Sequence, residues 1–248
     1  MNVPERLLDN VSFFTHRWPL KKTVDRIDTV TKEFGPSGGM RYVLSKRNFN
    51  VDEQWDNAEE TKKILTDKQT PAIIVFNHPH DLEGIMVRSV LPEKTDLSSI
   101  SMSGMERTFG DEFRKHIITV YHKQCGETSE EKQVRQEKNE EAIQKAVKKM
   151  QSGNNILIAP DGGEGNNFWR KGAVTLFENA FDLDNAYLVM TYVPDSKKGD
   201  IIRFLCKKQT SRTVRISEPI AVRDLPLPQE VKFMMKILKI ITLEIDHI

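Results

Sequence analysis

Two side chains with the chemistry of a general base and its partner, His78 and Glu83, are five residues apart. An apolar run at 73–76 precedes them and a helix-like run from about 82 to 90 follows, so the pattern predicts a strand, a tight turn and a helix. Glu83 would stand in the first helical turn and accept a hydrogen bond from one imidazole nitrogen, leaving the other to take a proton from a substrate hydroxyl. This pair is the core of a catalytic triad without its nucleophile. An acid at this offset from a histidine is also compatible with an ordinary turn.

The same turn offers a second chemistry. His78, His80 and Asp81 are ligand types for zinc or a related metal, and two histidines separated by one residue after a strand occur in metal sites. The other histidines of the sequence form no second tight cluster. A metal-dependent hydrolase is therefore the alternative, and we expect no metal or other cofactor.

The elements that position these residues alternate between apolar strands and amphipathic helices. We expect an α/β fold with a mixed, largely parallel central sheet flanked by helices, an N-terminal helical arm and a C-terminal amphipathic helix, because two β-α-β units follow each other. A single domain over 1–248 is expected, with an arm at 1–50, a core at 51–220 and a linker and helix at 221–248. The strands are predicted at 73–76, 99–102, 117–121, 156–159, 187–193, 201–206 and 213–216. The helices are predicted at 4–15, 20–34, 52–66, 82–90, 104–114, 129–151, 173–180 and 231–245, with a helix stop at 35–39 and a linker at 219–228.

A glycine-rich turn follows the predicted strand 156–159. Asp161, Gly162 and Gly163 lie in this turn, whose backbone N–H groups can hold an anion or an oxyanion, while Arg170 and Lys171 add positive charge nearby. The turn is not a P-loop, because no Gly-Lys-Ser/Thr follows at the required spacing. Glycine-rich turns also commonly serve backbone geometry alone.

Composition excludes several classes of protein. The 248 residues contain 37 Lys and Arg against 36 Asp and Glu, so no overall charge points to nucleic acid. The longest apolar runs, such as 187–193, are far shorter than the roughly 20 residues that a membrane span needs. The two cysteines form no metal-binding pattern, and the beginning of the sequence does not resemble a signal peptide. We expect a cytoplasmic protein.

The two ends of the sequence could contact a lipid surface. The arm carries clustered aromatic residues, and the predicted helix 231–245 has Lys232, Lys236 and Lys239 along one narrow side of an apolar cylinder. Such helices either lie on an anionic membrane or pack against the body of the protein with their lysine amines reaching water. We expect peripheral contact with a membrane.

Taken in order, these pieces resemble the glycerolipid acyltransferase family, which includes lysophosphatidate acyltransferases. The first family block is a strand followed by Asn-His, four residues and an acid, and 77–83 is similar. The third block is a strand ending in Pro-Glu-Gly-Thr-Arg and then Phe-Lys-x-Gly-Ala, which 158–163 and 168–173 resemble. The second block, a strand ending in a basic residue, would fall at 117–123, and the fourth, an apolar strand reaching a proline, at 188–194.

The resemblance implies acyl transfer from a thioester donor, acyl-CoA or acyl carrier protein, to a hydroxyl of a lysolipid or glycerol-phosphate-like acceptor. His78 would be the general base and Glu83 its partner. The residues that would hold the oxyanion or the acceptor are Asp161, Gly162, Gly163, Arg170, Lys171, His122 and Lys123. Gly163 and Glu164 replace the family's Thr-Arg, so its phosphate-binding arginine is absent. Either Arg170 or Lys171 compensates, or the acceptor is not a glycerol phosphate. A lipid-binding member of the same fold without activity is the non-enzyme alternative.

Overall fold

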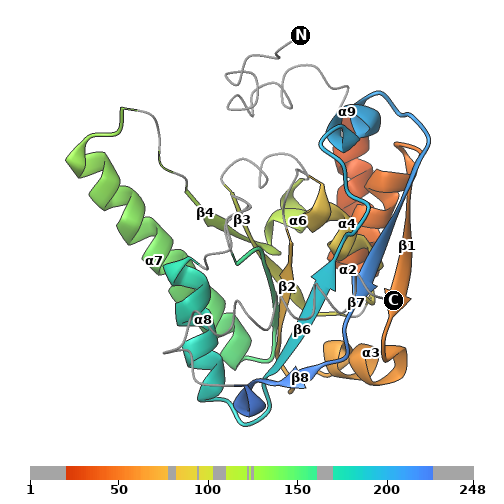
Figure 1. The fold of residues 1–248 in the computed structure, drawn as a ribbon. Coiled ribbons are helices and arrows are strands. Elements are labelled where there is room, and N and C mark those ends of the chain that lie inside the picture. The colour runs from red at the N-terminus through yellow and green to blue at the C-terminus, as the bar shows by residue number, and fades with distance from the viewer. Residues whose placement is uncertain are drawn as a thin grey trace.

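The computed structural model describes residues 21–77, 82–93, 95–102, 110–121, 123, 126–160 and 170–225. Within these residues, helices cover both faces of one β-sheet (Figure 1). The strands are β1 (Phe49–Trp55), β2 (Ala72–Phe76), β3 (Leu97–Met102), β4 (Ile117–Val120), β5 (Asn155–Ile158), β6 (Tyr187–Tyr192), β7 (Thr210–Ile216) and β8 (Ile220–Ala221). The helices are α2 (Lys21–Ser45), α3 (Ala58–Thr66), α4 (Glu83–Val90), α6 (Asp111–Arg114), α7 (Ser129–Gln151), α8 (Lys171–Phe181), α9 (Asp200–Leu205) and the short 3₁₀ helix η2 (Val222–Asp224).

The sheet is mixed and largely parallel, as predicted. Its strands follow the order β1-β7-β6-β2-β5-β3-β4, and β8 pairs with β6. The pairs of β6 with β7 and with β8 are antiparallel, and the other described pairs are parallel. Parallel strands require crossover connections, which is why helices cover the faces of the sheet. The predicted fold class is therefore confirmed.

The central strand β2 is buried on both faces. Ala72, Ile74 and Phe76 belong to one apolar cluster, which includes residues of α2, α3 and α4. Ile73 and Val75 belong to a second cluster, which includes residues of α7 and α8. A strand covered on both faces reads as an uninterrupted apolar run, which is how the sequence identified it.

The long helix α7 begins and ends where the sequence predicts. Thr128 caps its first turn, and a reciprocal bond from the backbone of Thr128 to Glu131 completes a capping box. Beyond its end, Gly153 has a φ of +88°, and a Cβ there would lie 1.8 Å from the carbonyl oxygen of Lys68. Only glycine fits this turn, which delivers the chain to β5.

Helix α2 differs from the prediction. The glycine-rich segment 35–39 does interrupt it, since Gly35 has φ 71° and ψ −178°, but a second helical arm then continues to Ser45. The two arms fold back on each other, because a Cβ on Gly39 would lie 2.3 Å from the Oγ1 of Thr31, eight residues earlier. Glycine here permits close packing between the arms as well as a break.

Three further predictions are wrong. The helix predicted at 52–66 is shorter, because β1 takes its first residues as an edge strand paired with β7. The strand predicted at 201–206 is the helix α9, and the linker predicted at 219–228 contains β8 and η2. The described parts of the other predicted strands, and the helices predicted at 82–90 and 173–180, are confirmed with shifts at their ends. The prediction 104–114 is helical in its described part, 111–114.

The membrane expectations fall largely on residues that the structure does not describe. The predicted helices 4–15 and 231–245 lie outside the described ranges. None of the helices within those ranges is both long enough and apolar enough to span a bilayer. Peripheral membrane contact and a cytoplasmic location stay predictions.

Candidate active site

The centre of the candidate site is the carboxyl end of β2, which lies between β5 and β6 in the sheet. Asn77 follows β2, and its Oδ1 accepts a hydrogen bond of 3.1 Å from the backbone N–H of Val193, just beyond β6. This bond ties the ends of the two strands together. The predicted base His78 is the next residue, and it lies outside the described residues together with His80 and Asp81. The role of His78 and the alternative metal site therefore stay predictions.

Glu83 is the first residue of α4, and it is completely buried. The hydroxyl of Ser196, in the loop after β6, donates a hydrogen bond to its Oε1. A carboxylate has about four acceptor positions, so this bond leaves capacity for an imidazole N–H as well. An ordinary turn does not require an acid that is buried in this way.

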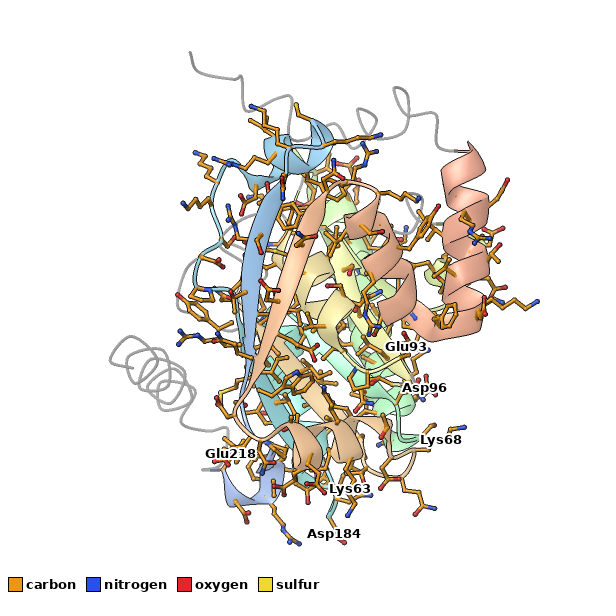
Figure 2. The ribbon with its side chains drawn as sticks, turned by 90° about the vertical axis from the view of Figure 1, so that its right-hand side faces the viewer. Lys63, Lys68, Glu93, Asp96, Asp184 and Glu218 are labelled. Atoms are coloured by element: carbon orange, nitrogen blue, oxygen red, sulfur yellow. The ribbon has the colours of Figure 1, made fainter. Side chains whose placement is uncertain are left out.

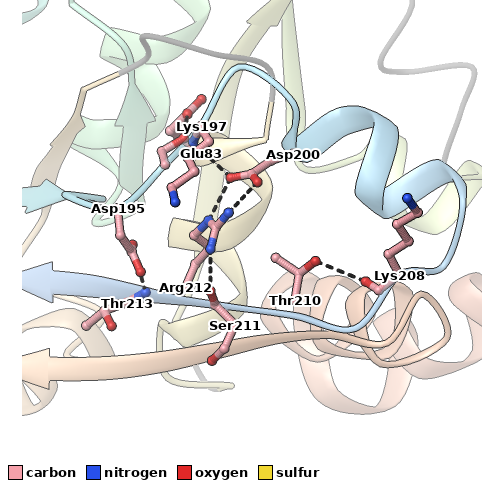
Figure 3. Close-up of polar contacts among 10 residues, drawn as sticks. Glu83, Asp195, Lys197, Asp200, Lys208, Thr210, Ser211, Arg212 and Thr213 are labelled. Atoms are coloured by element: carbon pink, nitrogen blue, oxygen red, sulfur yellow. Dashed lines mark hydrogen bonds and ion pairs between the residues drawn. The ribbon is translucent and has the colours of Figure 1, made fainter.

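The loop that carries Ser196 is fixed on both sides of this residue. Before it, the Oδ1 of Asp195 accepts a 3.1 Å hydrogen bond from the backbone N–H of Thr213 in β7. After it, the backbone N–H of Lys197 donates to Asp200 at 2.9 Å. Figure 3 shows Glu83 beside this loop. It also shows the polar contacts between the loop and β7. The Ser196 hydroxyl is thus presented to Glu83 from a supported segment.

A buried ion pair anchors the end of the same loop. Arg212 of β7 donates to both carboxylate oxygens of Asp200, at 2.7 and 2.5 Å, as Figure 3 shows. Burial alone would raise the pKa of Asp200, but the hydrogen bonds from Arg212 and from the Lys197 N–H hold that pKa below its ordinary value. The same hydrogen bond raises the pKa of Arg212, because it stabilises the charged guanidinium. Both groups are therefore charged, and removing either one would strand the other.

The glycine-rich segment connects β5 to α8. Its predicted functional residues Asp161, Gly162 and Gly163 lie outside the described residues. The backbone N–H of Arg170 donates a 2.8 Å hydrogen bond to the carbonyl of Pro160, so the two ends of the segment meet. Because β5 pairs with β2, this meeting point is beside the strand that leads to His78. The first and third blocks of the sequence are thus adjacent at their described ends.

Lys171, the first residue of α8, is highly exposed. Its Nζ lies 3.4 Å from the carboxylate of Glu140 on α7, and both side chains are more than half exposed. Solvent screens an ion pair of this kind, so it holds the lysine only weakly.

His122 and Lys123 follow the edge strand β4. His122 lies outside the described residues, and Lys123 is exposed. Strands β5 and β3 separate β4 from β2. At a spacing of about 4.8 Å per strand, β4 lies about 14 Å from β2. The roles predicted for His122 and Lys123 stay predictions.

Sequence reasoning missed the residues that support Glu83. Ser196, Asp195 and Asp200 follow β6 within eight residues of its end, but no motif marks them. The apolar residues of α9 were interpreted as a strand, which concealed the loop before it. Among the residues that the structure describes, no group of three or more His, Cys, Asp or Glu side chains could hold a metal ion.

The chain was compared with known proteins at three levels. No protein-family model matches the sequence, and a search of curated proteins found no match. Among solved structures, the chain is similar to the 1-acyl-sn-glycerophosphate acyltransferase PlsC from Thermotoga maritima, with a TM-score of 0.48 and 12% sequence identity. The similarity covers 92% of this chain and 83% of that chain.

Proposed function

We propose that the protein is an acyltransferase that moves a fatty acyl group from a thioester donor to the hydroxyl of a lipid-like acceptor. The observation that carries this proposal is the buried Glu83 carboxylate, which begins the helix after the Asn77-His78 strand end and accepts a hydrogen bond from Ser196. A buried acid in this place suits the partner of a catalytic histidine. The order of the four sequence blocks agrees with the same reading.

The reaction assigns one proton transfer to His78. The imidazole takes the proton of the acceptor hydroxyl while the hydroxyl oxygen attacks the thioester carbonyl carbon. The tetrahedral intermediate then collapses, the carbon–sulfur bond breaks, and the leaving thiolate takes the proton back from the imidazolium. Glu83 keeps the imidazole in the required tautomer and stabilises its charged form. General-base catalysis of this kind contributes about 10²- to 10⁴-fold.

The glycine-rich segment would stabilise the charge that develops on the carbonyl oxygen. Backbone N–H groups of Gly162 and Gly163 are the proposed donors, and Arg170 and Lys171 are the proposed cations for a phosphate of the donor or the acceptor. Support for this part comes from the hydrogen bond between Arg170 and Pro160, because it brings the ends of the segment beside β2. Asp161 would orient the turn. His122 and Lys123 would contact a more distant part of a substrate.

The donor is acyl-CoA or acyl carrier protein, and the acceptor is a lysolipid or a glycerol-phosphate-like alcohol. We propose that the protein works in the cytoplasm in peripheral contact with a membrane, where such acceptors reside. No bound cofactor is needed, because the thioester is itself activated for attack.

The test is release of free thiol from a long-chain acyl-CoA by the purified protein with a panel of lysolipid acceptors. Acceptor-dependent release is expected, and the acceptor that reacts fastest identifies the class. No release with any acceptor, nor with an acyl carrier protein as donor, would contradict the proposal. In that case binding to liposomes would favour a lipid-binding module, and stoichiometric zinc, manganese or iron in the purified protein would favour a hydrolase with His78, His80 and Asp81 as ligands.

A further inference from the structure

Five exposed cations and one exposed apolar side chain lie on and beside α9. We call this group the α9 surface, and it consists of Lys197, Lys198, Ile202, Arg203, Lys207 and Lys208, all of them exposed. Ile202 is 57% exposed, more than any other large apolar side chain within the described residues. A single exposed isoleucine is common on protein surfaces, but here every other residue of the α9 surface is a cation.

The charge of this surface has one sign. Residues 196–209 contain a single acid, Asp200, and its carboxylate is buried in the ion pair with Arg212. The five exposed charged side chains of the segment are therefore all positive. Exposed Lys46 lies close by, because Asn48 donates a 3.2 Å hydrogen bond to the carbonyl of Lys207. Since the whole chain has a net charge of only +1, this concentration of positive charge is local.

The exposure of Ile202 follows from the way α9 is anchored. Phe204 is buried and contacts the ring of Phe49 edge to face, with the ring centroids 6.3 Å apart. The guanidinium of Arg47 lies 5.6 Å from the centroid of the Phe204 ring. Positions two residues apart on an α-helix point about 200° apart, so an inward Phe204 directs Ile202 to solvent.

The α9 surface begins next to the candidate site. Lys197 and Lys198 directly follow Ser196, the residue that contacts Glu83. In Figures 1 and 2, α9 lies at the upper end of the molecule. Lys63 and Lys68, labelled in Figure 2, lie at the lower end. The α9 surface and these two lysines thus lie at opposite ends of the molecule.

We propose that the α9 surface docks the protein on a membrane that contains anionic lipid. The lysines and the arginine contact the headgroups, and Ile202 enters the interfacial region. This inference rests on the proposed function in one respect, since a lipid-like acceptor would then reach Glu83 and His78 directly from the bilayer.

The composition of the surface favours a membrane over an acidic protein. Four of its five cations are lysines, a residue type that protein–protein interfaces disfavour. Stable protein interfaces bury about 800 Å² on each partner around aromatic or arginine anchors, and one isoleucine is a small centre for such a contact. Flexible ammonium groups instead suit mobile headgroups, which need no fixed geometry.

Vesicle binding tests the proposal without any turnover. The full chain is sedimented with vesicles made of equal parts phosphatidylcholine and phosphatidylglycerol, and with phosphatidylcholine vesicles. We expect binding to the anionic vesicles that weakens as salt is added. Lys207→Gln/Lys208→Gln should lower the partition constant about 25-fold, roughly fivefold for each lysine. The matched pair Lys63→Gln/Lys68→Gln, at the opposite end of the molecule, should leave the constant unchanged.

A second pair of variants tests the apolar contact. Ile202→Ser should weaken vesicle binding severalfold. Val134→Ser, which changes another exposed apolar side chain on α7, should not. All four changed lysines and both apolar residues are exposed, so each variant should unfold at the same temperature as the unmodified protein.

Several results would overturn the docking proposal. The first is an equal loss of vesicle binding in the two lysine double variants. The second is equal binding of the unmodified protein to both kinds of vesicle. The third is a set of α9 variants that no longer bind an acidic carrier protein but still bind vesicles. The outcomes also separate this proposal from the proposed function. If the protein binds vesicles through α9 but shows no thioester turnover, only the proposed acyltransferase activity is refuted. If it shows turnover but its vesicle binding does not depend on α9, only the docking proposal is refuted.

Discussion

Ser196 and Glu83 are 113 residues apart in the chain, and the hydroxyl of Ser196 donates a hydrogen bond to the buried carboxylate of Glu83. The bond connects the loop after β6 to the first turn of α4. It fixes one oxygen of the carboxylate from outside the helix. An acid held in this way can direct its remaining acceptor positions to a single partner, which the proposed mechanism identifies as His78.

Removing the Ser196 hydroxyl should impair turnover more than substrate binding. We expect Ser196→Ala to lower kcat for thioester turnover about tenfold or more, because Glu83 then lacks one of the contacts that orient it. KM should change little, since Ser196 positions another residue and is not proposed to touch the substrate.

Ser196→Thr is the matched control for this change. It keeps a hydroxyl donor and should restore most of the lost kcat. A Ser196→Ala enzyme with an unchanged kcat would show that the bond has no role in positioning Glu83.

The ion pair between Asp200 and Arg212 should be essential for stability. Asp200→Ala leaves the Arg212 guanidinium buried without its counter-charge, so we expect the free energy of unfolding to fall by about 3 to 5 kcal/mol. The measurement is urea denaturation. The double variant Asp200→Ala/Arg212→Met should lose less than Asp200→Ala alone, because no charge is stranded. A double variant that is less stable than the single one would contradict this account.

Arg88 is a buried cation whose removal should stabilise the protein. It lies on α4 with its guanidinium 4.7 Å from the ring centroid of Phe113, and burial lowers its pKa to about 9. Among the described residues, none accepts a hydrogen bond from its Nη1. Arg88→Met keeps a contact with the ring and removes the buried charge, so the free energy of unfolding should rise by about 1 to 3 kcal/mol. A lower melting temperature for Arg88→Met would refute this interpretation.

His116 should make stability depend on pH. Burial lowers its pKa below the ordinary value of 6.5, and the positive charges of Arg88 and Lys149 act in the same direction, against the hydrogen bond to the Leu97 carbonyl. Below pH 6.5 the unfolded chain therefore binds a proton that the folded protein does not. The contribution to stability is fully present above pH 6.5 and is lost as the pH falls from there to the folded pKa.

The measurement for His116 is urea denaturation at about pH 7.5 and about pH 5.5. The unmodified protein should lose more stability between these two values than His116→Gln does. The comparison cancels the titration of the other groups, which both proteins share. An equal loss in both proteins would show that His116 does not carry the pH dependence.

Part of the fold could be predicted because local signals were strong. Helix α7 has no glycine or proline between its caps, and β2, β5 and β6 are mostly apolar because both faces of the sheet are covered. The edge strand β1 was missed because Asp52 and Glu53 within it resemble a helix surface. Its partner β7 lies 161 residues further along the chain. The apolar residues of α9 are compatible with either a short strand or a short helix. The contact between Phe204 and Phe49, which favours the helix, is not visible in the sequence.

The candidate site could be predicted only where its residues belong to one short segment. His78 and Glu83 are five residues apart, so their relation is visible in the sequence. Ser196 reaches Glu83 through the order of strands in the sheet, and Asp200 reaches Arg212 through a loop that no motif marks. Contacts across such distances depend on tertiary packing, which spacing along one sequence does not encode.

The most direct test of the central claim is the rate of acceptor-dependent thiol release by His78→Ala compared with the unmodified protein. The account predicts a loss of at least 10²-fold in kcat, with unchanged circular dichroism and melting temperature. Glu83→Gln should lose a comparable factor, whereas His116→Gln, which changes a histidine outside the site, should keep its activity. A folded His78→Ala protein with near-normal turnover would contradict the assignment of His78 as the base.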